Sequence, residues 1–171
     1  MSFLSRLFTK RDAGRDALRP LWHRTVAIAR EPRWYADYGV ADTVAGRFDA
    51  ITLVLSLVLL RMEREEAMIE PSIRLTELFV DDMDGQLREA GVGDLSVGKK
   101  VGRLMSVLGG RLGAIREALP QSEAALVEVI ERNVSLDENG NASRVASEVR
   151  RLAAEIDSLS SARLLAGDIP R

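Results

Sequence analysis

The sequence contains no cysteine and a single histidine, His23, among its 171 residues. This scarcity excludes disulfide bonds, a thiolate nucleophile, a zinc finger and any metal site built from several histidines. His23 has no serine or threonine partner in a local catalytic motif, so we interpret it as structural rather than as a general base. Much catalytic and metal-binding chemistry is therefore excluded.

A secretion signal and a long hydrophobic run are also missing. Residues 1–11 have no continuous apolar core of the kind that a signal peptide carries. The longest stretch without charge, residues 50–60, would form roughly 16 Å of helix, against a hydrocarbon thickness of about 30 Å. We therefore expect a cytoplasmic protein in which this stretch is a buried helix and does not span a membrane.

The charge balance shows no excess of one sign, because the formal net charge is only −2. Charges nevertheless occur in blocks: residues 1–33 and 95–116 are basic, and residues 61–94 and 117–138 are acidic. Such blocks disfavour a nucleic-acid binder, which needs a dominating basic field, and favour local patches for a partner protein or an anionic membrane. Neighbouring helices of opposite charge are the alternative explanation.

Aromatic residues are few, and they are concentrated in the first third of the chain. Only eight occur, and seven of them lie at or before Phe48. Aromatic side chains with polar tips bury much area at low entropic cost, so they are over-represented at binding surfaces, although a plug for the core is the alternative. The candidate binding residues are Trp34, Tyr35, Tyr38 and Phe48.

Hydrophobic periodicity predicts an all-α, single-domain bundle of about six helices. The predicted helices begin near Asp16, Asp42, Pro71, Ser96, Pro120 and Asn141, and the last one runs to about Ala166. Residues 51–60 are apolar around the whole helix circumference, which marks the second helix, at about residues 42–66, as the centre of the bundle. We expect Asp42 or Thr43 to be its N-cap and a non-helical connector to precede it.

The fourth predicted helix is rich in glycine, with Gly98, Gly102, Gly109, Gly110 and Gly113. Each glycine costs a helix roughly 1 kcal/mol relative to alanine. They therefore imply close helix approach, a kink or local mobility, and we favour a kink at Gly109 and Gly110.

The first 14 residues form an amphipathic basic segment ahead of a helical domain at residues 15–168. At helical spacing the apolar residues share one face, and basic residues flank it. The candidate membrane-contact residues are Phe3, Leu4, Leu7 and Phe8, with Arg6, Lys10 and Arg11. Two helical turns bury too little apolar area for more than weak, reversible membrane attachment. A frayed terminus, or a segment docked on the domain, is the alternative.

An acidic cluster at Asp81, Asp82 and Asp84 suggests a second class of function. Asp81 and Asp84 lie one helical turn apart, as in all-α enzymes that bind magnesium and a diphosphate or isoprenoid substrate. No second aspartate cluster in the sequence answers them, and we favour a solvated helix face as their explanation, with the enzyme as the alternative.

A basic group suggests a third function, a helical DNA-binding regulator. It would use Lys99, Lys100, Arg103 and Arg111 and would show a steep dependence of DNA affinity on salt.

Two long motifs resemble those of the ubiquinol–cytochrome c chaperone family. The first is Trp34-Tyr35-x-x-Tyr38-Gly39-Val40-x-Asp42-Thr43-x-x-Gly46-Arg47-Phe48-Asp49, followed by the apolar helix. The second is Asp82-Met83-Asp84-x-x-Leu87-Arg88-Glu89-x-Gly91-Val92-Gly93-Asp94-Leu95-x-Val97-x-Lys99-Lys100. The motifs occur in the expected order, and the resemblance covers roughly residues 20–120.

The resemblance implies a non-enzymatic assembly chaperone without a cofactor. Members of this family assist assembly of the respiratory cytochrome bc1 complex (complex III), and the implied client is newly made cytochrome b. A ribosome or a second assembly factor is a further candidate partner, together with peripheral membrane contact and no nucleic acid. The setting that we expect is the cytoplasmic face of a bacterial inner membrane.

Overall fold

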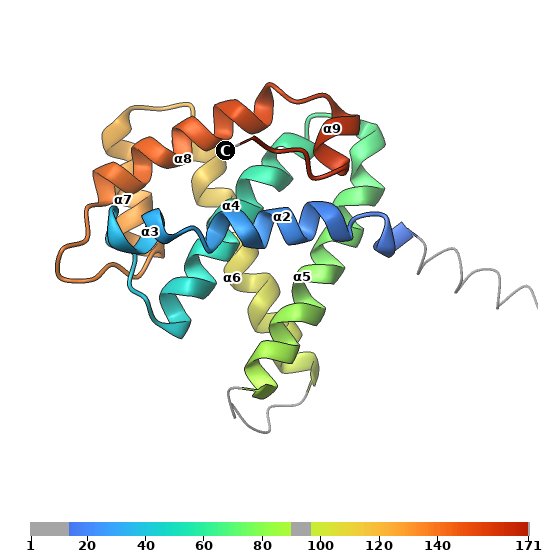
Figure 1. The fold of residues 1–171 in the computed structure, drawn as a ribbon, viewed down its shortest axis with the longest axis horizontal. Helices are drawn as coiled ribbons and strands as arrows, with labels where there is room; N and C mark the ends of the chain where they lie inside the picture. The colour runs from blue at the N-terminus through green and yellow to red at the C-terminus, as the bar shows by residue number, and fades with distance from the viewer. Residues whose placement is uncertain (1–13, 90–96, 171) are drawn as a thin grey trace, which may run out of the picture.

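The computed structural model describes residues 14–89 and 97–170. Within these ranges the chain is helical, and its only β-type pairing is an isolated bridge between Val40 and Leu136. The helices are α2 (Arg19–Ala29), α3 (Pro32–Ala36), α4 (Val44–Met62), η1 (Glu66–Met68), α5 (Ile69–Glu89), α6 (Val97–Ala118), α7 (Glu123–Asn133), α8 (Ala142–Asp157) and α9 (Ser161–Leu165). The predicted all-α fold is confirmed (Figure 1).

Helix α4 lies at the centre of the bundle and packs against α2, α5, α6 and α8 (Figure 1). Every residue from Ala50 to Leu59 is buried, which confirms the predicted central helix. The helix begins after Thr43, whose hydroxyl oxygen accepts a hydrogen bond from the Gly46 amide at 3.1 Å, so Thr43 is the predicted N-cap. In the described ranges, no helix has the length and apolarity needed to cross a bilayer.

Helices α5 and α6 form a hairpin that extends beyond the other helices (Figure 1). Helix α5 buries Leu75, Leu78, Phe79 and Met83 as the periodicity predicts. It begins at Ile69, two residues earlier than expected, because Pro71 also fits within the first turn, where a missing amide proton breaks no helical hydrogen bond.

Two predictions of local structure are wrong. The expected non-helical connector contains α3, which begins at Pro32 because the fixed φ of proline suits the first helical position. The expected last helix is interrupted after Asp157. There Ser160 takes an extended conformation and starts α9, because its hydroxyl accepts a hydrogen bond from the Arg163 amide at 3.4 Å.

The glycines of α6 face open space. A Cβ atom added at Gly102, Gly109, Gly110 or Gly113 would meet no neighbouring atom within 4 Å. Close helix approach is therefore the wrong explanation for these four glycines. Helix α6 continues from Val97 to Ala118, and a kink within it stays a prediction.

Candidate functional site

Two of the predicted binding aromatics attach α3 to the end of α2. Trp34 has no exposed surface, and its indole N–H donates a hydrogen bond to the Ile28 carbonyl at 2.8 Å. The Tyr35 hydroxyl donates to the Ala29 carbonyl at 2.8 Å, and its burial raises the pKa of the phenol. Both carbonyls belong to the last turn of α2, where the backbone carbonyl groups have no N–H donor within the helix. These aromatics therefore satisfy the C-terminal end of α2.

The third aromatic, Tyr38, lies beside a buried carboxylate of α8. Glu148 is buried, and its oxygens lie 2.8 Å from Nε of Arg151 and 3.3 Å from a guanidinium nitrogen of Arg33. The Tyr38 hydroxyl is 3.4 Å from the same carboxylate, and the ring of Tyr38 meets Trp34 edge to face. Burial, followed by the Glu148 charge, raises the pKa of Tyr38. This ion-pair cluster ties the segment after α3 to α8.

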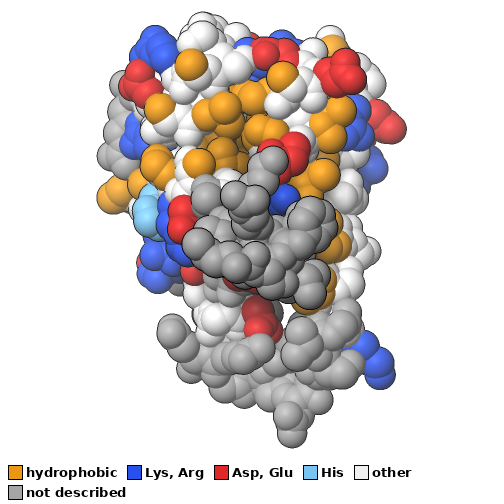
Figure 2. Space-filling view, turned by 90° about the vertical axis from the view of Figure 1, so that its right-hand side faces the viewer, with side chains coloured by type: hydrophobic (Ala, Val, Ile, Leu, Met, Phe, Trp, Pro, Cys, Tyr) orange, Lys and Arg blue, Asp and Glu red, His pale blue; other side chains and the backbone are white. Residues whose placement is uncertain are grey.

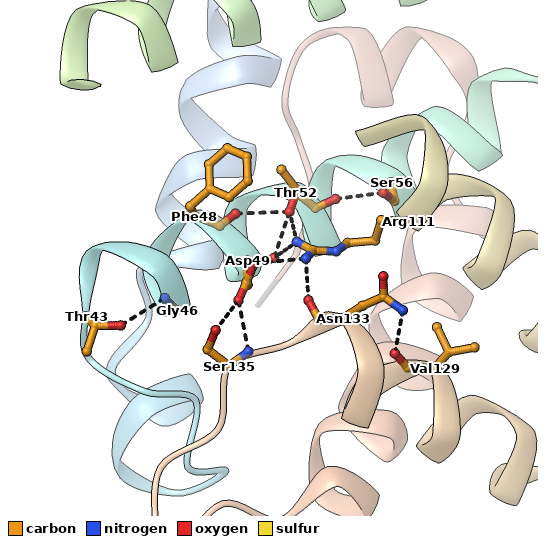
Figure 3. Close-up of polar contacts among 10 residues, drawn as sticks. All are labelled: Thr43, Gly46, Phe48, Asp49, Thr52, Ser56, Arg111, Val129, Asn133 and Ser135. Atoms are coloured by element: carbon orange, nitrogen blue, oxygen red, sulfur yellow. Dashed lines mark hydrogen bonds and ion pairs between the residues drawn. The ribbon is translucent and has the colours of Figure 1, made fainter. Parts of the chain in front are cut away.

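The first motif ends at Asp49, which forms a buried ion pair with Arg111 of α6 (Figure 3). Their side chains are 13% and 5% exposed, and Oδ1 of Asp49 accepts a hydrogen bond from Arg111 at 2.8 Å. The other oxygen, Oδ2, accepts from the hydroxyl and the amide of Ser135 at 2.7 and 2.9 Å. Arg111 also donates to the Thr52 hydroxyl and the Asn133 carbonyl. One carboxylate thus joins α4, α6 and the loop after α7.

This geometry corrects the DNA-binding hypothesis at Arg111. A phosphate contact needs an accessible guanidinium group, but all of the hydrogen bonds of Arg111 point into the protein. Arg111 is therefore a structural residue.

Two glycines of the first motif mark places where backbone segments touch. Gly39 has a φ of 72°, and a Cβ atom there would lie 2.4 Å from the Cα of Gly140. A Cβ atom at Gly46 would lie 1.9 Å from the Ala41 carbonyl oxygen. Only glycine avoids both clashes. We call residues 34–49 and their partners the motif joint.

The motif joint performs an architectural role for the residues that we proposed as a binding site. Tyr35, Tyr38 and Phe48 are partly buried against the core, and Phe48 packs on Phe79 with a ring-centroid distance of 6.3 Å. Client contact by the four aromatics stays a prediction. For Trp34 it requires a rearrangement, since no part of the side chain is exposed.

The acidic cluster of α5 does not form a metal site. Asp81 pairs with Arg15, and Asp82 accepts a hydrogen bond from Gln86 at 3.3 Å. Across the part of the chain that the structure describes, no three histidine, cysteine, aspartate or glutamate side chains converge to hold a metal ion. His23, which we interpreted as structural, is exposed and lines a hollow of about 560 Å³ between α2 and α5.

An apolar groove lies next to this hollow, where α6 packs beside α5, and Arg15 and Asp81 line both. Its volume is about 460 Å³, and its apolar lining is Ile73, Val80, Val101 and Met105. Ile73 is 53% exposed, Met105 is 41% exposed, and Ile69, one turn before Ile73, is 56% exposed. We call this surface the α5–α6 groove. Figure 2 shows hydrophobic side chains gathered on the face where α5 lies.

Charged side chains border the α5–α6 groove. Arg15, Glu77 and Asp81 contribute to its lining, and Arg15 pairs with Asp81. On α5, Arg74 lies 3.0 Å from Glu70 and 3.2 Å from Glu77, and hydrogen bonds to these carboxylates raise the pKa of Arg74. An apolar centre within a polar rim is the anatomy of a protein-binding surface.

This groove was not predicted from the sequence, although the sequence carries a signal for it. Ile69, Ile73 and Val80 have helical spacing and form a second apolar stripe on α5, on a different face from the buried residues of that helix. Val101 and Met105 have helical spacing on α6. Which stripe is buried depends on the placement of other helices, so the pattern alone does not identify the exposed one.

Several predicted residues lie outside the described ranges. They include the candidate membrane contacts at residues 1–13 and residues 90–96 of the second motif. Within that motif, Met83 is buried in α5 and Lys99 is exposed on α6.

The described residues thus form an all-α domain with an exposed apolar groove, a surface of the kind that binds proteins. A family model described as ubiquinol-cytochrome C chaperone matches residues 36–171, so the chain belongs to this family. The crystal structure of the Cbp3 homolog from Brucella abortus is similar, with 30% sequence identity and a TM-score of 0.81, over 98% of this chain and 95% of that one. Comparison with curated proteins gives no match. These findings support a chaperone role.

Proposed function

We propose that this chain is a non-enzymatic assembly chaperone that binds newly made cytochrome b and promotes assembly of the cytochrome bc1 complex. Family membership supports the chaperone role, and the α5–α6 groove is the observation that supports protein binding. Cytochrome b is a membrane protein, so its apolar segments need shielding before assembly. An exposed apolar groove with a charged rim is suited to hold such a segment.

The groove has the dimensions of a helix-binding surface. Its lining follows α5 from Ser72 to Asp81, nine helical steps or roughly 14 Å, which is about two and a half turns of a client helix. Ile73 and Met105 lie on opposite walls, so a client side chain between them would contact both helices. Recognition of one apolar helix face in a groove is a recurrent mode of binding that tolerates different sequences.

The proposed location is the cytoplasmic face of a bacterial inner membrane. Residues 1–14 would supply weak membrane attachment through Phe3, Leu4, Leu7 and Phe8, with Arg6, Lys10 and Arg11 near the anionic headgroups. A ribosome or a second assembly factor would add a further contact. Because basic residues take part, we expect the membrane association to weaken at high salt.

Replacing Ile73 with aspartate tests the groove in cells that assemble a bc1 complex. Ile73→Asp places a charge in the apolar lining, and we expect copurified cytochrome b to fall on the order of tenfold, which corresponds to about 1.4 kcal/mol. The matched control is Val44→Asp, because Val44 is 71% exposed and lies outside the groove, at the start of α4.

Aspartate at Val44 is also compatible with a helix N-terminus, so this control should fold and retain the client. Equal loss of cytochrome b from both variants would contradict the groove as the client site. Normal bc1 levels after deletion of the gene would refute the proposed function itself.

A further inference from the structure

We propose that residues 1–13 dock in the α5–α6 groove of the same molecule when no client is bound. The proposal rests on the proposed function only in that the groove is taken to be the client site, since the docking itself needs no cytochrome b. Residues 1–13 would occupy the groove in the free protein and shield its apolar lining from water until a client displaces them.

The described chain begins beside the groove. A Cβ atom at Gly14 would lie 3.9 Å from Nε of Arg74 and 4.0 Å from a carboxylate oxygen of Glu70, so the backbone of Gly14 lies close to α5. The next residue, Arg15, lines the groove and pairs with Asp81. Figure 1 shows this first described segment next to α5. Residues 1–13 are therefore attached at the rim of the groove.

The segment is long enough to cover the groove. Thirteen residues in a helix would extend roughly 20 Å, and the groove lining follows α5 for roughly 14 Å between Ser72 and Asp81. Because the attachment is direct, docking is an intramolecular step with an effective concentration on the order of millimolar. Even a weak apolar contact is then sufficient to populate the docked state.

The segment carries an apolar face that complements the groove. At helical spacing Phe3, Leu4, Leu7 and Phe8 lie together, and the groove presents its own apolar set from two helices. That set is Ile73, Val80, Val101 and Met105. Docking would bury the exposed side chains of Ile73 and Met105 against the apolar residues of the segment.

The charges of the two surfaces are also complementary. The segment contains Arg6, Lys10 and Arg11 with one acidic residue, Asp12. The groove lining contains two acidic side chains, Glu77 and Asp81, and one basic side chain, Arg15. Attraction between exposed charges falls with ionic strength, so docking should weaken as salt is added.

Docking gives residues 1–13 a role in client capture. A single apolar face cannot lie in the groove and in a membrane at the same time. Insertion of this face into the membrane would therefore leave the groove open where cytochrome b is made. The groove would be covered on the free protein and accessible at the membrane surface.

Cysteine crosslinking tests the proposal on the purified full-length chain without a client, because the natural sequence has no cysteine. The variant Ser5→Cys/Ser72→Cys places one thiol in the segment and one in the groove lining. The matched control keeps Ser5→Cys and moves the second thiol to Ser147, which is exposed on α8. A short bismaleimide should link the groove pair at least about tenfold faster than the control pair.

A second control changes only the apolar face. Leu4→Ser and Leu7→Ser, added to the groove pair, preserve the tether and should slow the crosslinking of that pair. An equal rate with and without these two changes would overturn the proposal, because the tether alone would then explain the link. Dimeric products whose rate rises with protein concentration would also overturn it, because the occupant would then be a second copy. Either failure leaves the cytochrome b experiment unaffected.

Discussion

The buried pair between Asp49 and Arg111 gives the sharpest test of what holds the motif joint together. Replacing Asp49 with alanine leaves the guanidinium group of Arg111, which is 5% exposed, without its carboxylate. Loss of one partner of a buried ion pair costs roughly 3–5 kcal/mol, because the remaining charge stays desolvated and uncompensated. The Ser135 hydroxyl and amide lose their acceptor as well.

We expect the lower part of that range for Asp49→Asn and the upper part for Asp49→Ala. Asparagine keeps an acceptor oxygen of similar shape, and Arg111 retains the Asp49 backbone carbonyl at 3.0 Å in both variants. Urea unfolding followed by circular dichroism measures the free energy of unfolding. A loss of 3–5 kcal/mol is a large share of the roughly 5–15 kcal/mol that stabilises a typical domain.

The matched control is Glu128→Ala, which breaks an exposed pair with Arg132 on α7. Exposed pairs contribute about 0–1 kcal/mol, so this variant should unfold close to the wild-type midpoint. Asp49→Leu combined with Arg111→Met should cost less than Asp49→Ala alone, because no charge stays buried. A loss below about 1 kcal/mol for Asp49→Ala would refute the account of this pair.

Two further predictions concern glycine and tyrosine. Gly39→Ala should destabilise the fold and Gly102→Ala should stabilise it by up to about 1 kcal/mol, since a Cβ meets Gly140 in the first case and open space in the second. Urea midpoints check both, and the same sign for the two changes would contradict the local geometry. Burial raises the pKa of Tyr35 above 10.0, so the unfolded chain ionises first and stability falls as pH rises past about 10. The free energy of unfolding should therefore fall less for Tyr35→Phe than for the wild type when the pH is raised from about 9 to about 11. An equal fall in both proteins would show that burial of Tyr35 does not cause the pH dependence.

Helix positions follow from short-range patterns, and the patterns predicted them well. The continuous apolar run at residues 51–60 leaves no polar face for solvent, so α4 had to be central. Thr43 could be recognised as a cap because capping is a contact over three residues. The interruption between α8 and α9 was missed because Ser160 competes with a continuing apolar pattern, and only the packing decides between them.

The joint itself could not be predicted in the same way. Asp49 and Arg111 are far apart in the sequence, and no local sequence pattern around either residue predicts that they pair. The contact between Gly39 and Gly140 depends on how two loops meet. The first motif was recognisable as a pattern, but its physical content, close backbone contact and buried charge, appears only when distant segments are brought together.

The α5–α6 hairpin has a mechanical consequence. Helix α4 packs against four other helices and is joined to α6 by the buried pair of Asp49 with Arg111, so we expect the base of the molecule to resist deformation. The outer part of the hairpin extends past that base, and there Gly85 of α5 and Gly102 of α6 face open space without side chains that would pack on a neighbour (Figure 1). We therefore expect elastic compliance to be concentrated in this arm. Amide hydrogen exchange should be fastest there, and an apolar partner would bend this arm around itself while the base keeps its shape.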